Sequence, residues 1–178
     1  MPHLPQLEVD GPQPRRDGGA VVVDWWCDLA CSECADSLEV NESLRDRYGD
    51  RLVIRLRHFP LPNHVWAVAA AQCQSEAAAQ GLGDAYAAAA LATIDAIDGP
   101  ADYVELADHL GLDSDEVAEA LFDRRHASTV RGDHDAGRAL GVRGTPTWVV
   151  DGLLVDASST VDGALAVLEG RIERALAP

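Results

Sequence analysis

Two cysteines three positions apart, Cys31 and Cys34, stand where a short apolar run ends and a helical pattern begins. The run covers residues 20–26, and its valines and tryptophans favour a buried β-strand. The helical pattern continues to Tyr48, after which Gly49 is expected to end the helix. At the start of a helix, unpaired N–H groups and the helix dipole favour a negative charge on the first sulfur. The sequence therefore predicts a strand, a reactive thiol pair and a helix, in that order.

This spacing suits thiol–disulfide exchange, in which one thiolate attacks a disulfide and a second thiol resolves the mixed disulfide. Cys31 is predicted to be the exposed nucleophile, and Cys34, one turn further along, the shielded resolving thiol. The alternative is half of a zinc site, which would need Cys27 with His58 or His64 as further ligands. In the redox interpretation Cys27 is a possible third thiol that resolves, protects or simply packs, and packing is the first choice.

The rest of the chain alternates between the two kinds of secondary structure. A second strand is predicted over 52–59, where prolines end it, and a helical block over 63–140. Residues 147–151 and 153–155 resemble a hairpin with an Asp-Gly turn, and 159–176 an amphipathic helix. The order predicts an α/β fold.

Details of the helical block follow from apolar spacing and from end signals. Val65, Val68, Ala69 and Cys73 recur at three- and four-residue steps, which predicts a helix, and Cys73 is expected to be a small buried residue on its apolar face. An acidic capping box at 113–116 predicts a helix start, and the helix over 127–140 should end at a glycine.

A second feature is Pro146, which leads directly into the apolar segment that begins at Thr147. Proline in a sheet is confined to positions such as a strand start, and X-Pro bonds are where cis peptides occur. Base rates alone favour an ordinary trans proline. The combination with the distant cysteine pair favours the cis alternative.

Together these segments resemble the DsbA-like branch of the thioredoxin superfamily. The resemblance is carried by Val21–Trp26, Cys31–Cys34, Arg57–Leu61 and Gly141–Thr147, and it runs from about residue 20 to 155. It implies a thioredoxin fold, a central β-sheet flanked by helices, with an inserted all-helical domain. The expected organisation is as follows: a flexible arm over 1–19, a thioredoxin core over 20–61 and 141–178, and a helical insertion over 62–140.

The resemblance also implies roles for three supporting residues. Pro146 would be a cis proline facing the cysteine pair, and the backbone of Thr145 would pair with a bound substrate strand. Asp24 resembles the buried carboxylate that relays the proton of the second cysteine, although it lies one residue further from Cys31 than usual.

The two residues between the cysteines, Ser32 and Glu33, depart from the family pattern. An acidic neighbour stabilises a thiolate less, and a less stabilised thiolate makes a less oxidising disulfide. We therefore expect a reductant or isomerase-like poise. The expected partners are proteins or small molecules that carry thiols or disulfides, and a recycling partner whose identity is unknown. The alternatives are a glutathione-dependent isomerase or transferase of the same superfamily, and a zinc-binding or interaction module.

Composition and charge narrow the functions and locations that remain open to this chain. The chain has 14 basic and 30 acidic residues and a net charge of -16, which disfavours binding to nucleic acid. No apolar run reaches the roughly 18–20 residues of a membrane span, so membrane insertion is not expected. The Pro/Gly-rich first 19 residues lack the apolar centre of a secretory signal, which favours a cytoplasmic location. No cofactor and no metal are expected.

Overall fold

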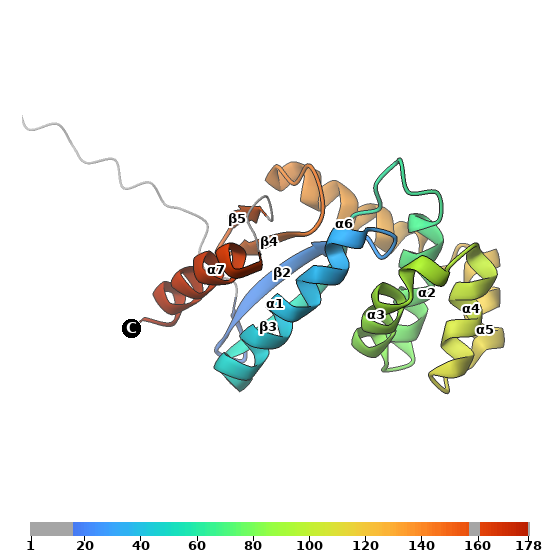
Figure 1. The fold of residues 1–178 in the computed structure, drawn as a ribbon, viewed down its shortest axis with the longest axis horizontal. Helices are drawn as coiled ribbons and strands as arrows, with labels where there is room; N and C mark the ends of the chain where they lie inside the picture. The colour runs from blue at the N-terminus through green and yellow to red at the C-terminus, as the bar shows by residue number, and fades with distance from the viewer. Residues whose placement is uncertain (1–15, 157–160, 178) are drawn as a thin grey trace, which may run out of the picture.

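The computed structural model describes residues 16–156 and 161–177. Within them, a β-sheet has helices on both faces, and a further group of helices lies beside one end of the sheet (Figure 1). The strands are β1 Arg16–Asp17, β2 Ala20–Cys27, β3 Leu52–His58, β4 Thr147–Val150 and β5 Leu153–Asp156. The α-helices are α1 Ser32–Tyr48, α2 Ala67–Ala79, α3 Gly83–Ala92, α4 Pro100–His109, α5 Ser114–Phe122, α6 Ala127–Leu140 and α7 Val161–Leu176. The expected α/β thioredoxin fold with helices inserted between two strands is confirmed.

The sheet is organised around β2. β3 runs parallel to it on one side, connected through α1, while β4 runs antiparallel on the other side and continues to β5. A parallel neighbour requires a long crossover connection, and α1 provides it. Because β4 pairs only with residues 23–26 of β2, the start of β2 is left for β1, which pairs with Ala20 and Val21.

The expected flexible arm over residues 1–19 needs a correction at its end. Arg16 and Asp17 belong to β1 and are hydrogen-bonded to the first residues of β2. The Asp17 carboxylate also accepts a hydrogen bond of 2.6 Å from Arg55 on β3. The first 15 residues lie outside the described part of the chain.

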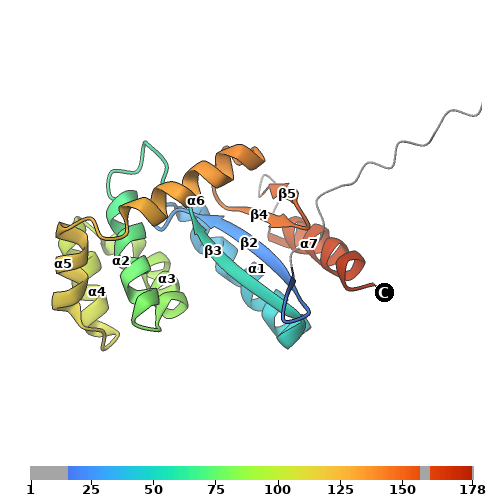
Figure 2. The same cartoon turned by 180° about the vertical axis from the view of Figure 1, so that it is seen from behind.

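The two faces of the sheet have different cores. Every residue of β2 is buried, and Val23, Trp25 and Cys27 face the main core beneath α1 and α7. The smaller core contains Trp26, and α6 crosses it on the opposite face (Figure 2). A Cβ atom on Gly137 of α6 would collide with the Trp26 indole, so the helix lies as close as a glycine permits. Successive side chains of β2 thus point alternately into the main core and toward the smaller core beneath α6.

The residues that carry the helical spacing of the first inserted helix do not share one buried face. Val65 is 79% exposed and Val68 is 52% exposed, whereas Cys73 is buried. Helix α2 begins only at Ala67, after Val65, and it packs against α3, α4 and α5 through its alanines. Alanine side chains allow neighbouring helices to approach closely. The alanine face of α2 is therefore buried, although the valines are larger and more apolar.

The sequence signals for turns and helix ends agree with the structure better than the apolar spacing does. Asp151 and Gly152 have φ angles of 57° and 71°, which the two-residue turn between β4 and β5 requires. The Asp113 side chain accepts a hydrogen bond from the Glu116 amide at the start of α5. Helix α6 ends at Leu140, and the glycine that follows it, Gly141, has a left-handed backbone conformation. No helix in residues 16–156 or 161–177 has the length and apolar character needed to cross a membrane.

Candidate active site

The cysteine pair lies at the N-terminus of α1. Cys31 has an extended backbone and caps the helix, and its amide donates to the Asp28 carbonyl at 3.1 Å. The Cys34 amide donates to the Cys31 carbonyl at 3.0 Å, which closes the first turn. All four cysteines of the chain are free thiols in this structure. The local backbone thus holds both sulfurs at the start of a helix, where the dipole favours negative charge.

Cys31 is more enclosed than the sequence suggested. Its exposed fraction is 2%, so the expectation of an exposed nucleophile is wrong for this thiol form. The Glu33 carboxylate covers one side and accepts the Cys31 thiol hydrogen at 3.0 Å. The Thr145 carbonyl lies 3.7 Å from the same sulfur on another side. Glu33 itself is exposed to solvent.

The pKa values of both thiols are raised. For Cys31 the largest cause is its hydrogen bond with Cys34, followed by burial, the charge of Cys34 and the hydrogen bond to Glu33. Burial is the main cause for Cys34. In turn, the hydrogen bond from Cys31 lowers the pKa of Glu33. The carboxylate therefore stabilises the protonated thiol rather than the thiolate.

The distant proline segment meets this helix start. The Thr145–Pro146 peptide bond is cis and immediately precedes β4. Pairing of Trp26 on β2 with Thr147 on β4 brings the segment to the end of β2, from which the chain continues to the cysteines. The Thr147 hydroxyl donates to the Gly144 carbonyl at 2.8 Å and closes the loop. The Thr145 carbonyl is thereby directed at Cys31.

Asp24 is not brought to the cysteines. It lies on the opposite face of β2 from Cys27, because an odd number of residues along a strand reverses the side. Its carboxylate is 3.9 Å from the Arg57 guanidinium, which also pairs with Asp133 of α6 at 3.1 Å. The Asp24 side chain belongs to a charged group beneath α6, and the geometry gives no support for proton relay to Cys34.

Sequence reasoning missed a different carboxylate, that of Asp28. Its side chain is fully buried and accepts hydrogen bonds from the Ala30 amide at 2.9 Å and the Leu61 amide at 2.8 Å. His64 Nδ1 lies 2.8 Å from the same carboxylate. The Asp28 amide donates to the Cys34 sulfur at 3.5 Å. Asp28 thus joins the cysteine loop to the loop that follows β3.

A signal for part of this role was present in the sequence. An aspartate just after a buried strand commonly accepts a hydrogen bond from the amide two residues later, as Asp28 does from Ala30. Nothing local indicates the partners at Leu61 and His64, which are more than 30 residues away.

The third thiol, Cys27, is the last residue of β2 and is 1% exposed. Burial is the main cause of its raised pKa, and an interaction with the Cys34 side chain acts in the opposite direction. Cys73 lies on α2, where burial raises its pKa to about 11. Cys27 therefore contacts the redox pair directly.

The candidate zinc ligands do not assemble. His58 is buried and its Nε2 lies 3.0 Å from the Ser75 hydroxyl, while burial lowers its pKa to about 4. His64 instead pairs with Asp28. Within residues 16–156 and 161–177, no three or more His, Cys, Asp or Glu side chains are grouped so that they could hold a metal ion. The histidines are engaged in holding loops and helices.

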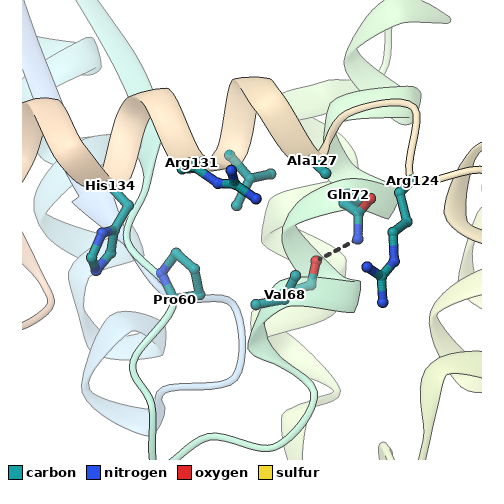
Figure 3. Close-up of a pocket in the computed structure, with 8 residues that line it drawn as sticks. Pro60, Val68, Gln72, Arg124, Ala127, Arg131 and His134 are labelled. Atoms are coloured by element: carbon teal, nitrogen blue, oxygen red, sulfur yellow. Dashed lines mark hydrogen bonds between the residues drawn. The ribbon is translucent and has the colours of Figure 1, made fainter.

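A pocket of about 410 Å³ opens beside the loop after β3, between α2 and α6 (Figure 3). Pro60 and Val68 line one side, and Arg131 and His134 the other. His134 stacks on Phe59, with 4.5 Å between ring centroids. No sulfur lines this pocket, so it is separate from the thiol site.

Comparison with protein families finds one model that covers most of the chain. The DSBA-like thioredoxin domain matches residues 22–168. Two curated relatives are sodium/proton antiporters: NhaA 3 of Salinispora tropica is 35% identical over 140 residues, and NhaA 1 of Salinispora arenicola is 33% identical over 155. These alignments cover 77% and 86% of this chain, but only 21% and 23% of the relatives. The chain spans about a fifth of their length.

Solved structures share the fold at low identity. Oxidised BdbD from Bacillus subtilis has a TM-score of 0.78 and 17% identity, with 93% of this chain and 97% of BdbD covered. A thioredoxin-like oxidoreductase from Silicibacter pomeroyi has a TM-score of 0.72 and 20% identity, with coverages of 86% and 85%. DsbA from Klebsiella pneumoniae has a TM-score of 0.68 and 16% identity, with coverages of 93% and 92%.

Proposed function

This chain belongs to the family of DSBA-like thioredoxin domains, and we propose that it is a thiol–disulfide oxidoreductase whose reactive pair is Cys31 and Cys34. The observation that carries the proposal is the meeting of this pair with the cis Thr145–Pro146 segment, which comes from more than a hundred residues away. The substrates would be thiols or disulfides of proteins or small molecules.

In the reducing direction, the Cys31 thiolate attacks one sulfur of a substrate disulfide, and the departing substrate sulfur takes up a proton. The Cys34 thiol then loses its proton and attacks the Cys31 sulfur of the mixed disulfide. The second substrate sulfur leaves as a thiol, and the Cys31–Cys34 disulfide remains. The substrate is thereby reduced by two electrons and the enzyme oxidised by two. The oxidising direction is the same sequence reversed.

Thr145 contributes a backbone group beside this chemistry. Its carbonyl lies 3.7 Å from the Cys31 sulfur. We propose that the Thr145 backbone pairs with an extended substrate backbone and that Pro146 fixes the direction of the Thr145 carbonyl. A strand that pairs there would place its own sulfur opposite Cys31.

The proposed poise is that of a reductant or isomerase, and Glu33 supports it. Its carboxylate accepts the Cys31 thiol hydrogen, adding to the contact with Cys34 and the burial that raise the pKa of Cys31. Strong oxidants such as DsbA, at about -120 mV, depend on a stabilised reduced form, whereas thioredoxin lies near -270 mV. We therefore expect a potential below about -180 mV, in the range of disulfide isomerases and thioredoxins.

The test combines insulin reduction with equilibration in glutathione redox buffers. Wild type should reduce insulin, and Cys31→Ala should be inactive. Glu33→Gln should lower the pKa of Cys31, seen as faster alkylation near neutral pH, and should shift the potential upward. A wild-type potential near -120 mV would contradict the proposed poise, and activity that survives Cys31→Ala would contradict the proposed function.

A further inference from the structure

Three buried thiols, Cys27, Cys31 and Cys34, belong to the same core where β2 ends and α1 begins. The side chains of Cys27 and Cys31 each interact with that of Cys34, and both interactions shift the pKa of the Cys34 thiol. Independently, the amide N–H of Asp28, in the peptide that joins it to Cys27, lies 3.5 Å from the Cys34 sulfur. Cys34 is therefore next to two possible disulfide partners.

Their shared burial limits what Cys27 can react with. Cys27, Cys31 and Cys34 are 1%, 2% and 0% exposed, and all three belong to the main core. A thiol that is shielded from solvent but in contact with a disulfide sulfur reacts within the protein, where proximity replaces a bimolecular encounter. For Cys27, the sulfur in contact is that of Cys34.

We propose that Cys34 forms two alternative disulfides, with Cys31 or with Cys27, and that exchange between them converts the dithiol enzyme into a form with a single reactive thiol. The inference rests on the proposed function, because it begins from the Cys31–Cys34 disulfide. The Cys27 thiolate attacks the Cys34 sulfur, the Cys34–Cys31 bond breaks, and a Cys27–Cys34 bond forms. Cys31 leaves as a thiolate and takes up the proton that Cys27 lost. The number of disulfides is unchanged, so no external oxidant is needed.

The two oxidised forms have different chemistry. With the Cys31–Cys34 disulfide, the protein accepts electrons from a substrate dithiol. With the Cys27–Cys34 disulfide, Cys31 is a thiol that can attack a substrate disulfide, but Cys34 is no longer free to resolve the product. The mixed disulfide then persists until another substrate thiol attacks it, which is the course of an isomerisation.

Disulfide mapping of the wild-type protein tests this directly. Oxidised protein is freed of small thiols, incubated in mildly alkaline buffer and quenched in denaturant containing N-ethylmaleimide. Cleavage after Asp and Glu separates the cysteines, because Asp28 lies between Cys27 and Cys31, and Glu33 lies between Cys31 and Cys34. We expect a linked Cys27–Cys34 peptide pair and matching alkylation of Cys31. If Cys34 is found linked only to Cys31, with Cys27 fully alkylated, the inference is overturned.

Variants separate this inference from the proposed function. Cys27→Ser should lose the second link completely, whereas Cys73→Ala, which alters another buried cysteine of the same core, should keep both links. Failure of wild type to form any Cys31–Cys34 disulfide would refute the proposed function. Formation of that disulfide without any Cys27–Cys34 link would refute only the shared-partner inference, and the wild-type mapping decides this even if a variant does not fold.

Discussion

Replacing Asp28 should cost stability in proportion to the hydrogen bonds that each replacement loses. One carboxylate oxygen accepts from the Ala30 amide, and the other accepts from the Leu61 amide and faces His64 Nδ1. Asparagine can place its single oxygen at the second position, which keeps the contacts to Leu61 and His64. Its amide nitrogen then faces the Ala30 amide, so one hydrogen bond is lost. Alanine loses all three.

The magnitudes follow from this count. A hydrogen bond to a charged group contributes about 1.5–3 kcal/mol, but such bonds are not additive, and removing the charge also relieves its desolvation. Leaving a buried donor without its partner costs about 1–3 kcal/mol, and Asp28→Ala does so at the Ala30 and Leu61 amides. We therefore expect Asp28→Ala to lower the free energy of unfolding by about 3–5 kcal/mol, and Asp28→Asn by about 1–2 kcal/mol.

Urea unfolding of the reduced proteins at neutral pH measures both values, since reduction removes any contribution from a disulfide. The control is Asp84→Ala, whose carboxylate is 76% exposed and pairs with Arg45 at 3.3 Å. It should change stability by less than about 0.5 kcal/mol. The reasoning fails if Asp28→Ala is as stable as this control, or if Asp28→Asn is as damaging as Asp28→Ala.

Three further outcomes are expected. Gly137→Ala should destabilise the protein by about 1–3 kcal/mol, because the added Cβ meets the Trp26 indole. Gly132→Ala lies in open space on the same helix and should be neutral or stabilising. Thermal melts compare the two variants, and equal effects would contradict the close packing. Buried His58, with a pKa of about 4, stays neutral between pH 6.5 and 4 while the unfolded chain takes up a proton. The contribution of His58 to stability should therefore fall by about 3 kcal/mol as pH drops through that window. Unfolding measured at several pH values should show a shallower slope for His58→Gln, and an unchanged slope would count against this. Cys34→Ser should abolish insulin reduction and accumulate a mixed disulfide, detected by mass spectrometry; full activity would favour a glutathione-dependent enzyme instead.

Local chemistry explains why much of the fold was predictable. The turn at Asp151–Gly152, the cap at Asp113 and the stop at Gly141 each depend on backbone angles or on contacts within a few residues. Such features are recorded in short stretches of sequence. The strand before the cysteines was equally accessible, because a central strand buried on both faces appears as a continuous apolar run.

Features that depend on distant contacts were predicted poorly. Val65 and Val68 continue a helical spacing, but α2 turns its alanines toward its neighbours, and only the packing partners decide that choice. The enclosure of Cys31 depends on the Glu33 rotamer and on the Thr145 carbonyl, which is 114 residues away. Spacing around the cysteines contains no information on either.

The alternation of side chains along β2 explains why Asp28, and not Asp24, contacts the cysteine loop. Both aspartates precede the cysteine pair, and the resemblance to the family motif selected Asp24, although it lies one residue further from Cys31 than usual. If Trp25 and Cys27 face the core that receives α1, alternation turns Asp24 to the other face. Asp28 is the first acidic residue after the strand, where alternation no longer applies, and its carboxylate contacts the cysteine loop at the Ala30 amide. Strand parity is thus a stronger constraint on a supporting residue than its distance in sequence from the cysteines.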